Sequence, residues 1–166
     1  MKRTILIPTD FSSESLDMIE HVIEQDATAE FHFVLTHCCF MSDCPINLLY
    51  FSKTELVQSL KTPEYIKKCN TLRRRYADRK ITITTEIFTG LNQAAFANFI
   101  DGNRIDEAVI PKRYAPRLNL DNSFNPLPFI KKSRLKITEV ALGHPSPNQN
   151  KHQPHLELIQ PPFLSA

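Results

Sequence analysis

The chain has 166 residues, 42% of them hydrophobic, and its 20 Lys and Arg residues nearly balance its 18 Asp and Glu residues. This length predicts one domain with its own core, and the net charge of +2 argues against a dedicated nucleic-acid-binding protein. No apolar stretch approaches the roughly 20 residues of a membrane helix. Residues 1–8 hold only a short apolar run, so we expect no signal peptide and a cytoplasmic protein.

The first part of the chain predicts a strand, a helix and a second strand. The continuous apolar run of residues 5–7, closed by Pro8, is typical of a buried strand. Apolar residues at helical spacing follow over residues 16–23, and Ser12 is placed to cap the amino end of this helix. Residues 30–39, rich in Phe, Val, Leu and Thr, predict the second strand.

The middle of the chain predicts a loop over residues 40–52 and then a long, charged helical region. Pro63 should break that region, because proline removes a helix hydrogen-bond donor and clashes with the preceding turn. Residues 81–87 alternate between apolar and polar, which indicates a strand with one solvent-facing side or a place at the edge of a sheet. Residues 92–100 predict another helix.

The last elements complete an alternation of strands and helices. Residues 101–103, Asp-Gly-Asn, are a helix stop signal, and residues 105–110 and 135–142 predict two more strands. Residues 111–133 contain four prolines and no glycine and leave room for one short helix near residues 129–132. The pattern predicts a doubly wound, Rossmann-like α/β fold, with a five-stranded, mainly parallel sheet and helices on both faces.

The composition changes after residue 142. Five prolines alternate with Asn, Gln, His and Lys, a mixture that supplies no core. We therefore expect an α/β domain over residues 1–142 and a Pro-rich flexible tail over residues 143–166.

Four signatures in this order and spacing resemble the universal stress protein family: residues 5–12 (ILIPTDFS), residues 36–38 (THC), Gly90 with the helix after it, and residues 106–110 (DEAVI). The resemblance covers about residues 3–142. It implies the strand order 3-2-1-4-5, a stress-response role and a homodimer formed through the fifth strand. Lys136 and Glu139 interrupt that strand here, which puts the usual interface in doubt.

The ATP-binding motif of the family is missing from this chain. Members that bind ATP carry Gly-x2-Gly-x9-Gly-Ser/Thr after the fourth strand, where glycines let the backbone approach the phosphates. Here residues 111–123 contain no glycine, Pro111 removes a donor, and Asn122-Ser123 stands near the final Gly-Ser. The resemblance implies a vestigial nucleotide site made of Pro8, Thr9, Asp10, Cys38, Asn122 and Ser123.

Two sets of residues keep alternative interpretations. Lys112, Arg113 and Arg117 are either a solvated loop or side-chain cations that replace the glycine donors and bind an anion. Asp10 is either a nucleoside ligand or a turn aspartate that accepts from nearby backbone N–H groups.

The cysteines and basic residues give weaker signals. The run His37-Cys38-Cys39 would suit zinc, but adjacent strand residues point to opposite faces, so we expect core cysteines and no metal site. Cys44, in the predicted loop, is the candidate for a redox-sensitive thiol. Residues 73–75 are three arginines at a helix carboxyl end, where the helix dipole favours cations, and we expect no nucleic-acid binding.

No catalytic motif is present, so we predict a protein that is not an enzyme; a weak nucleotide hydrolase is the enzymatic alternative. The predicted function is a stress-related regulatory or interaction protein with a degenerate nucleotide pocket and no tightly bound cofactor. The alternative is a protein that still binds ATP, AMP or another anionic nucleotide through Lys112, Arg113 and Arg117. The expected partners are a second copy of the chain and another protein, with no membrane association.

Overall fold

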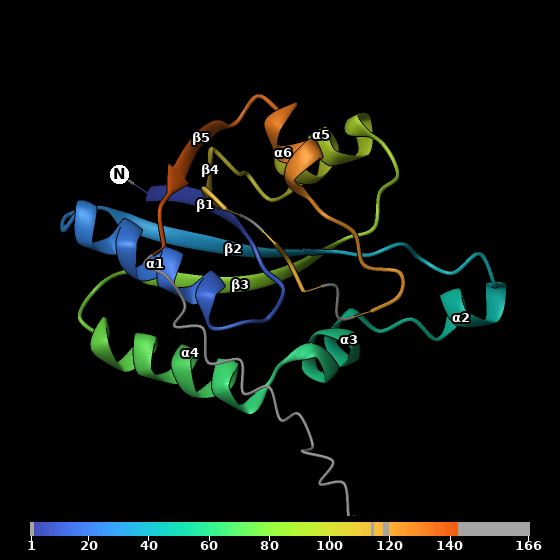
Figure 1. Ribbon diagram of the computed structural model, residues 1–166, viewed down its shortest axis with the longest axis horizontal. Helices are drawn as coiled ribbons and strands as arrows, with labels where there is room; N and C mark the ends of the chain where they lie inside the picture. The colour runs from blue at the N-terminus through green and yellow to red at the C-terminus, as the bar shows by residue number, and fades with distance from the viewer. Residues whose placement is uncertain (1, 114, 118–119, 143–166) are drawn as a thin grey trace, which may run out of the picture.

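A five-stranded parallel sheet forms the centre of the protein (Figure 1). The computed structural model describes residues 2–113, 115–117 and 120–142. The strand order is β3-β2-β1-β4-β5, and every neighbouring pair is parallel. The strands are β1 (Lys2–Pro8), β2 (Glu30–Cys38), β3 (Ile81–Phe88), β4 (Glu107–Pro111) and β5 (Lys136–Val140). The predicted fold class and strand order are confirmed, and the pairing is parallel throughout the sheet rather than only mainly so.

Helices cover both faces of the sheet (Figure 1). One face carries α1 (Glu14–Gln25), α3 (Lys53–Leu60) and α4 (Pro63–Arg75). The other face carries α5 (Gln93–Gly102) and α6 (Leu127–Lys131). The short helix α2 (Pro45–Leu49) projects away from these layers.

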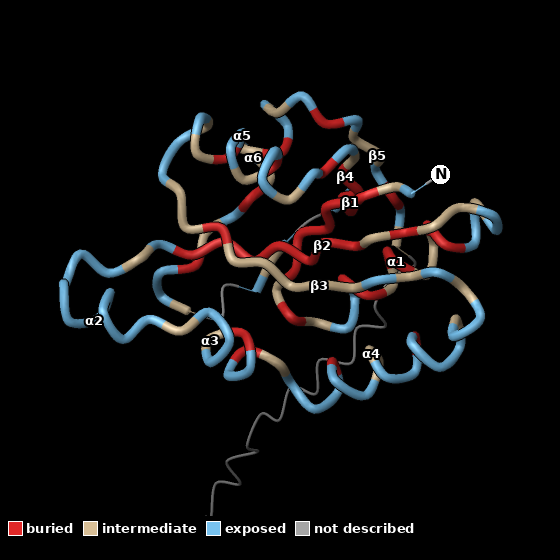
Figure 2. The backbone as a smooth tube through the Cα atoms, turned by 180° about the vertical axis from the view of Figure 1, so that it is seen from behind, coloured by how far each residue is buried: buried red, intermediate tan, exposed pale blue. Residues whose placement is uncertain are grey.

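Alternation along β1 divides the core between the two faces. Ile5 and Ile7 pack under α1 and α4, whereas Leu6 packs under α5 and α6, and all three are fully buried. A strand covered on both sides needs this continuous apolar run. The strand β3 is mostly half-buried, as its position at the edge of the sheet requires (Figure 2).

The start of α1 differs from the prediction that Ser12 caps it. The helix begins at Glu14, and the preceding Ser13 makes no capping hydrogen bond. The side-chain contact that holds this turn lies before the helix, where the Asp10 carboxylate accepts from the Ser12 backbone N–H at 3.0 Å. Phe11, at φ 60°, turns its side chain into the core, where only 1% of it is exposed.

The predicted break at Pro63 is confirmed. Pro63 starts α4, and the hydroxyl of Thr62 caps this helix by accepting from the Tyr65 backbone N–H at 3.2 Å. The expected loop over residues 40–52 is wrong in part, since it contains α2 with Pro45 at its first turn, a position that proline tolerates.

None of the helices in the described part of the chain is long and apolar enough to cross a bilayer. The predicted flexible tail, residues 143–166, lies outside the described residues.

The carboxyl end of α5 places a non-glycine residue in the left-handed region. Arg104 has φ 54°, its N–H donates to Asp101 O at 3.1 Å, and Ile105 N–H donates to Ile100 O at 3.0 Å. These two bonds form a Schellman motif, whose turning position usually holds glycine. The Gly102 of the stop signal belongs instead to the last turn of the helix.

Arg104→Gly should therefore stabilise the protein. Glycine adopts positive φ without the clash of a β-carbon, so the free energy of unfolding should rise by about 0.5–1 kcal/mol and Tm by roughly 1–4 °C. Thermal unfolding measures the change. Arg104→Ala is the matched control, because it keeps the β-carbon and should give no gain; equal Tm values for the two variants would contradict this account.

Candidate functional site

The crevice expected in a doubly wound sheet lies where the strand order changes direction, at the carboxyl ends of β1 and β4. In this protein the crevice is nearly closed. The cavity left there is about 30 Å³, room for one or two water molecules. Its lining comes from the β1–α1 turn, from α1, from the segment after β4 and from the end of the domain: Pro8, Asp10, Ser12, Glu14, Ser15, Met18, Pro111, Arg113, Ala115 and Leu142.

The turn after β1 is held by its own polar side chains. The Thr9 hydroxyl accepts from the Phe11 backbone N–H at 3.0 Å and lies 2.9 Å from the Ser15 hydroxyl. The second carboxylate oxygen of Asp10 accepts from the Arg117 backbone N–H at 3.0 Å. Asp10 therefore has the turn role that the sequence analysis considered for it. It also bonds the turn to the segment after β4, 107 residues away in the sequence.

Residues 122–124 pair with the end of β2. The Phe40 N–H donates to Asn122 O at 2.8 Å, and the Asn122 side-chain amide donates to Phe40 O at 2.6 Å. Phe124 N–H donates to Cys38 O at 3.0 Å, and Cys39 and Ser123 form an antiparallel bridge between them. The chain itself thus occupies the end of β2.

Two phenylalanines cover this pairing. The rings of Phe40 and Phe124 stack with their centroids 4.4 Å apart, and Phe124 also meets Phe88 edge-on at 6.2 Å. The sequence analysis did not identify Phe40 or Phe124 as site residues. The only sequence signal was that Phe124 directly follows the predicted site residue Ser123 and that Phe40 lies two residues after Cys38.

His37 is a buried polar side chain near the end of β2. Its Nδ1 lies 3.1 Å from Thr9 O and its Nε2 lies 3.0 Å from the Ser123 hydroxyl. A carbonyl oxygen only accepts, so Nδ1 carries the proton, and the neutral ring accepts the Ser123 hydroxyl proton at Nε2. Burial lowers the pKa of His37, against the smaller opposing effects of the Thr9 hydrogen bond and the Asp10 charge.

The Ser123–His37 contact resembles a nucleophile and its general base. However, Ser123 is 8% exposed and His37 is 4% exposed, and neither lines the small cavity. Their hydrogen bond ties the segment after β4 to the end of β2.

The structure places the remaining predicted residues as follows. Cys38 is 1% exposed, and burial raises the pKa of its thiol. Of the three cations, Arg113 lines the small cavity together with the carboxylates Asp10 and Glu14. Lys112 and Arg117 have exposed side chains and join the fold through their backbone N–H groups, to Val140 O and Asp10.

The cysteines do not gather around a metal position. Cys38 and Cys39 are buried core residues and Cys44 is exposed at the start of α2. Within the described residues, no three His, Cys, Asp or Glu side chains come close enough together to bind an ion. A redox role for Cys44 stays a prediction.

The buried His37 should make the protein less stable in mild acid. Its pKa is lower in the folded chain than the unfolded value near 6.5, so the unfolded state takes up the proton first. Its contribution to stability is complete above pH 7 and is lost as the pH falls through the folded pKa, at up to about 1.4 kcal/mol per pH unit.

Urea unfolding of His37→Gln between pH 7.5 and 5 tests this. Because glutamine does not titrate, the free energy of unfolding of this variant should change less with pH. His32→Gln is the control: burial also lowers the pKa of His32, but His32 is only half-buried and should contribute less. A slope in His37→Gln as steep as in the unchanged protein would contradict the assignment.

No protein-family model matches the sequence, and no curated protein matches it. Solved structures do. The hypothetical protein MJ0577 superposes with a TM-score of 0.51 at 19% identity, over 86% of this chain and 98% of that one. The universal stress protein UspA from Lactobacillus plantarum gives 0.49 at 14% identity, over 83% and 97%. A universal stress protein family member from Arabidopsis thaliana with AMP bound gives 0.45 at 13% identity, over 87% and 97%.

The likeness to MJ0577 extends over nearly the whole of that protein and most of this one. The all-parallel sheet with order 3-2-1-4-5 agrees with it. The chain therefore shares its doubly wound α/β fold with MJ0577.

Proposed function

We propose that this protein is a divergent universal stress protein of the cytoplasm, acting without catalysis in stress-related regulation through contacts with other proteins. The observation that carries the proposal is the closed crevice: residues 122–124 lie on the end of β2 and the remaining cavity is about 30 Å³. Small-molecule sites usually measure about 300–1,000 Å³. A nucleotide would have to displace the chain before it could bind.

The cost of that displacement is large compared with nucleotide affinity. Opening breaks the two bonds between Phe40 and Asn122, the Phe124–Cys38 bond and the His37–Ser123 bond. At about 0.5–1 kcal/mol net for each, the opening free energy is about 2–4 kcal/mol and lowers the apparent affinity roughly 30- to 1,000-fold.

The charge of the crevice also disfavours phosphates. Asp10 and Glu14 line the cavity opposite a single lining cation, Arg113. A phosphate group there would meet two carboxylates, and like charges at short distance repel. This arrangement supports a protein that has lost tight ATP binding.

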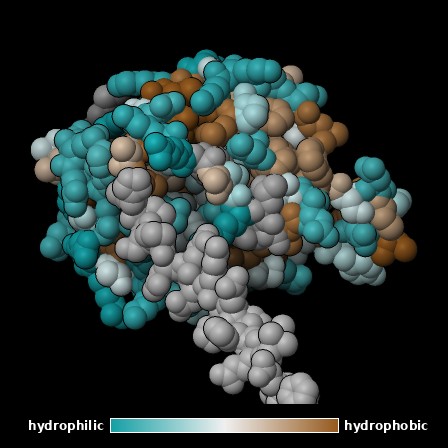
Figure 3. All heavy atoms as spheres, in the orientation of Figure 1, coloured by the Kyte–Doolittle hydropathy of each residue, from teal (hydrophilic) through white to brown (hydrophobic). Residues whose placement is uncertain are grey.

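An exposed apolar segment supports the interaction role. Large side chains from the end of β2 through α2 are solvent-exposed, with Leu49 at 78% and Tyr50 at 77%. The part of this segment that contains α2 projects from the molecule in Figures 1 and 3. The exposed members of this segment are Phe40, Ile46, Leu48, Leu49, Tyr50 and Phe51. Patches of this kind are typical of protein-binding surfaces.

A homodimer through β5 is the second part of the proposal. The strand is at the edge of the sheet and pairs with β4 on one side. Its other side offers backbone donors and acceptors to a second copy. Lys136 and Glu139 are exposed on this strand, and they would have to be accommodated at that interface.

The protein purified without added nucleotide should carry none. We expect native mass spectrometry to give the mass of the polypeptide alone, as a dimer, and calorimetric titration to show no low-micromolar binding of ATP. One equivalent of ATP or ADP released on denaturation, or a low-micromolar Kd, would refute the proposal.

The alternative function, binding of an anionic nucleotide, rests on Arg113, the one candidate cation that lines the crevice. If it were correct, Arg113→Ala would weaken the titrated binding at least tenfold. Lys132→Ala is the matched control, since Lys132 is exposed and does not line the crevice. We expect neither variant to change the titration.

A further inference from the structure

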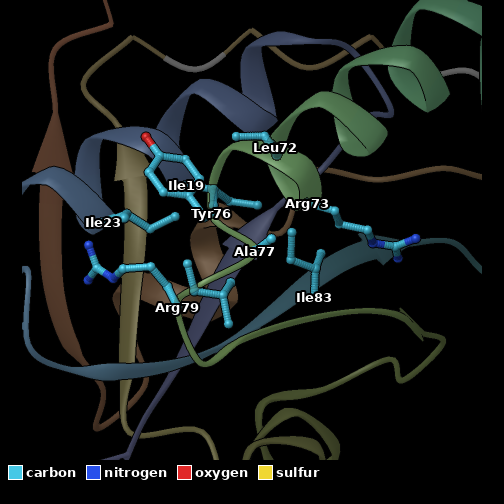
Figure 4. Close-up of a pocket in the computed structure, with 9 residues that line it drawn as sticks. Ile19, Ile23, Leu72, Arg73, Tyr76, Ala77, Arg79 and Ile83 are labelled. Atoms are coloured by element: carbon cyan, nitrogen blue, oxygen red, sulfur yellow. The ribbon is translucent and has the colours of Figure 1, made fainter.

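A second cavity lies between α1, the carboxyl end of α4 and β3 (Figure 4). Its volume is about 220 Å³, the space of about seven water molecules. It is lined by Ile19, Ile23, Leu72, Arg73, Tyr76, Ala77, Arg79, Ile81 and Ile83. It shares no lining residue with the crevice of β1 and β4 and is independent of it.

Six of the nine residues that line this cavity are aliphatic, and polar groups share the walls with them. Ile19, Ile23 and Leu72 are buried, whereas Ile81 and Ile83 are half-buried along the edge strand. Hydrocarbon that replaces water against such walls is stabilised by about 25 cal/mol per Å² of apolar surface removed from water, and it also gains dispersion contacts. The cavity therefore favours an aliphatic group.

The charged residues of the cavity are both cations. Arg79 is half-buried and donates from Nη2 to Asp26 O at 2.7 Å, and Arg73 lies on the opposite side (Figure 4). Among the described residues neither has a carboxylate at ion-pair distance. By contrast, Lys68 and Arg75 of the same helix α4 pair with Asp17 and Glu20.

We propose that this cavity binds a small aliphatic carboxylate, with the carboxylate at the Arg79 guanidinium and a chain of about six to eight carbons against the isoleucines. Arg79 still has donors beyond the one bonded to Asp26 O, and a guanidinium pairs with a carboxylate through two parallel bonds. Tyr76, drawn between Ile23 and Leu72 in Figure 4, also lines the cavity.

The probe for this site is octanoate, and its binding is followed by NMR of isoleucine δ1 methyl groups. We expect saturable binding with a Kd at or below about 1 mM. The methyl signals of Ile19, Ile23, Ile81 and Ile83 should shift. Those of Ile100 and Ile130, on the opposite face of the sheet, should stay in place and serve as internal controls.

The charge requirement is tested with a neutral ligand and matched variants. Octanamide should bind at least tenfold more weakly than octanoate, and Arg79→Gln should weaken octanoate binding about tenfold. Arg74→Gln, on the same helix but outside the cavity, should leave the Kd unchanged. The octanamide comparison uses the unaltered protein and does not depend on the folding of a variant.

Three results would overturn the proposal. They are no saturable shift up to about 10 mM octanoate, shifts confined to Ile100 and Ile130, and equal affinities for octanoate and octanamide.

Discussion

The hydrogen bond from the Ser123 hydroxyl to the His37 ring joins the end of β2 to the segment after β4, across 86 residues of sequence. Thr9 fixes the other nitrogen of the same ring, so His37 connects three chain segments at the point where a doubly wound sheet usually opens. The pairing of residues 122–124 with residues 38–40 depends on this tie, and the stacked Phe40 and Phe124 rings cover it. The polar groups of this region are hydrogen-bonded to other parts of the chain, so they are not left open for a ligand.

Much of the fold was predictable from local patterns. Three of its features depend on only a few neighbouring residues. They are the apolar run at residues 5–7, the alternation at residues 81–87 and the helix break at Pro63. The αL position at Arg104 was not predictable, because Gly102 two residues earlier is the stronger local signal and tertiary packing decides which residue turns.

The site was predictable only in part, since Pro8 and Asp10 line the crevice cavity, whereas the other predicted vestigial-site residues do not: Thr9, Cys38, Asn122 and Ser123. The positions near Pro8, Asp10, Cys38 and Ser123 follow from the resemblance, and the loss of the glycines follows from composition. That Asn122 and Ser123 lie on the end of β2 was not predictable, because the pairing depends on the path of the preceding proline-rich segment. The aliphatic cavity under α4 was also missed, since its walls come from α1, α4 and β3 and no sequence window contains them together.

The central claim is that the chain itself closes the crevice, and amide hydrogen exchange measured by NMR tests it most directly. The amides of Phe40 and Phe124 donate to Asn122 O and Cys38 O, so they report the pairing itself. The account predicts that both exchange at least about 30-fold more slowly than an unstructured amide without nucleotide, and that millimolar ATP leaves their rates unchanged. Exchange at the unstructured rate, or protection that arises only when ATP is added, would contradict it.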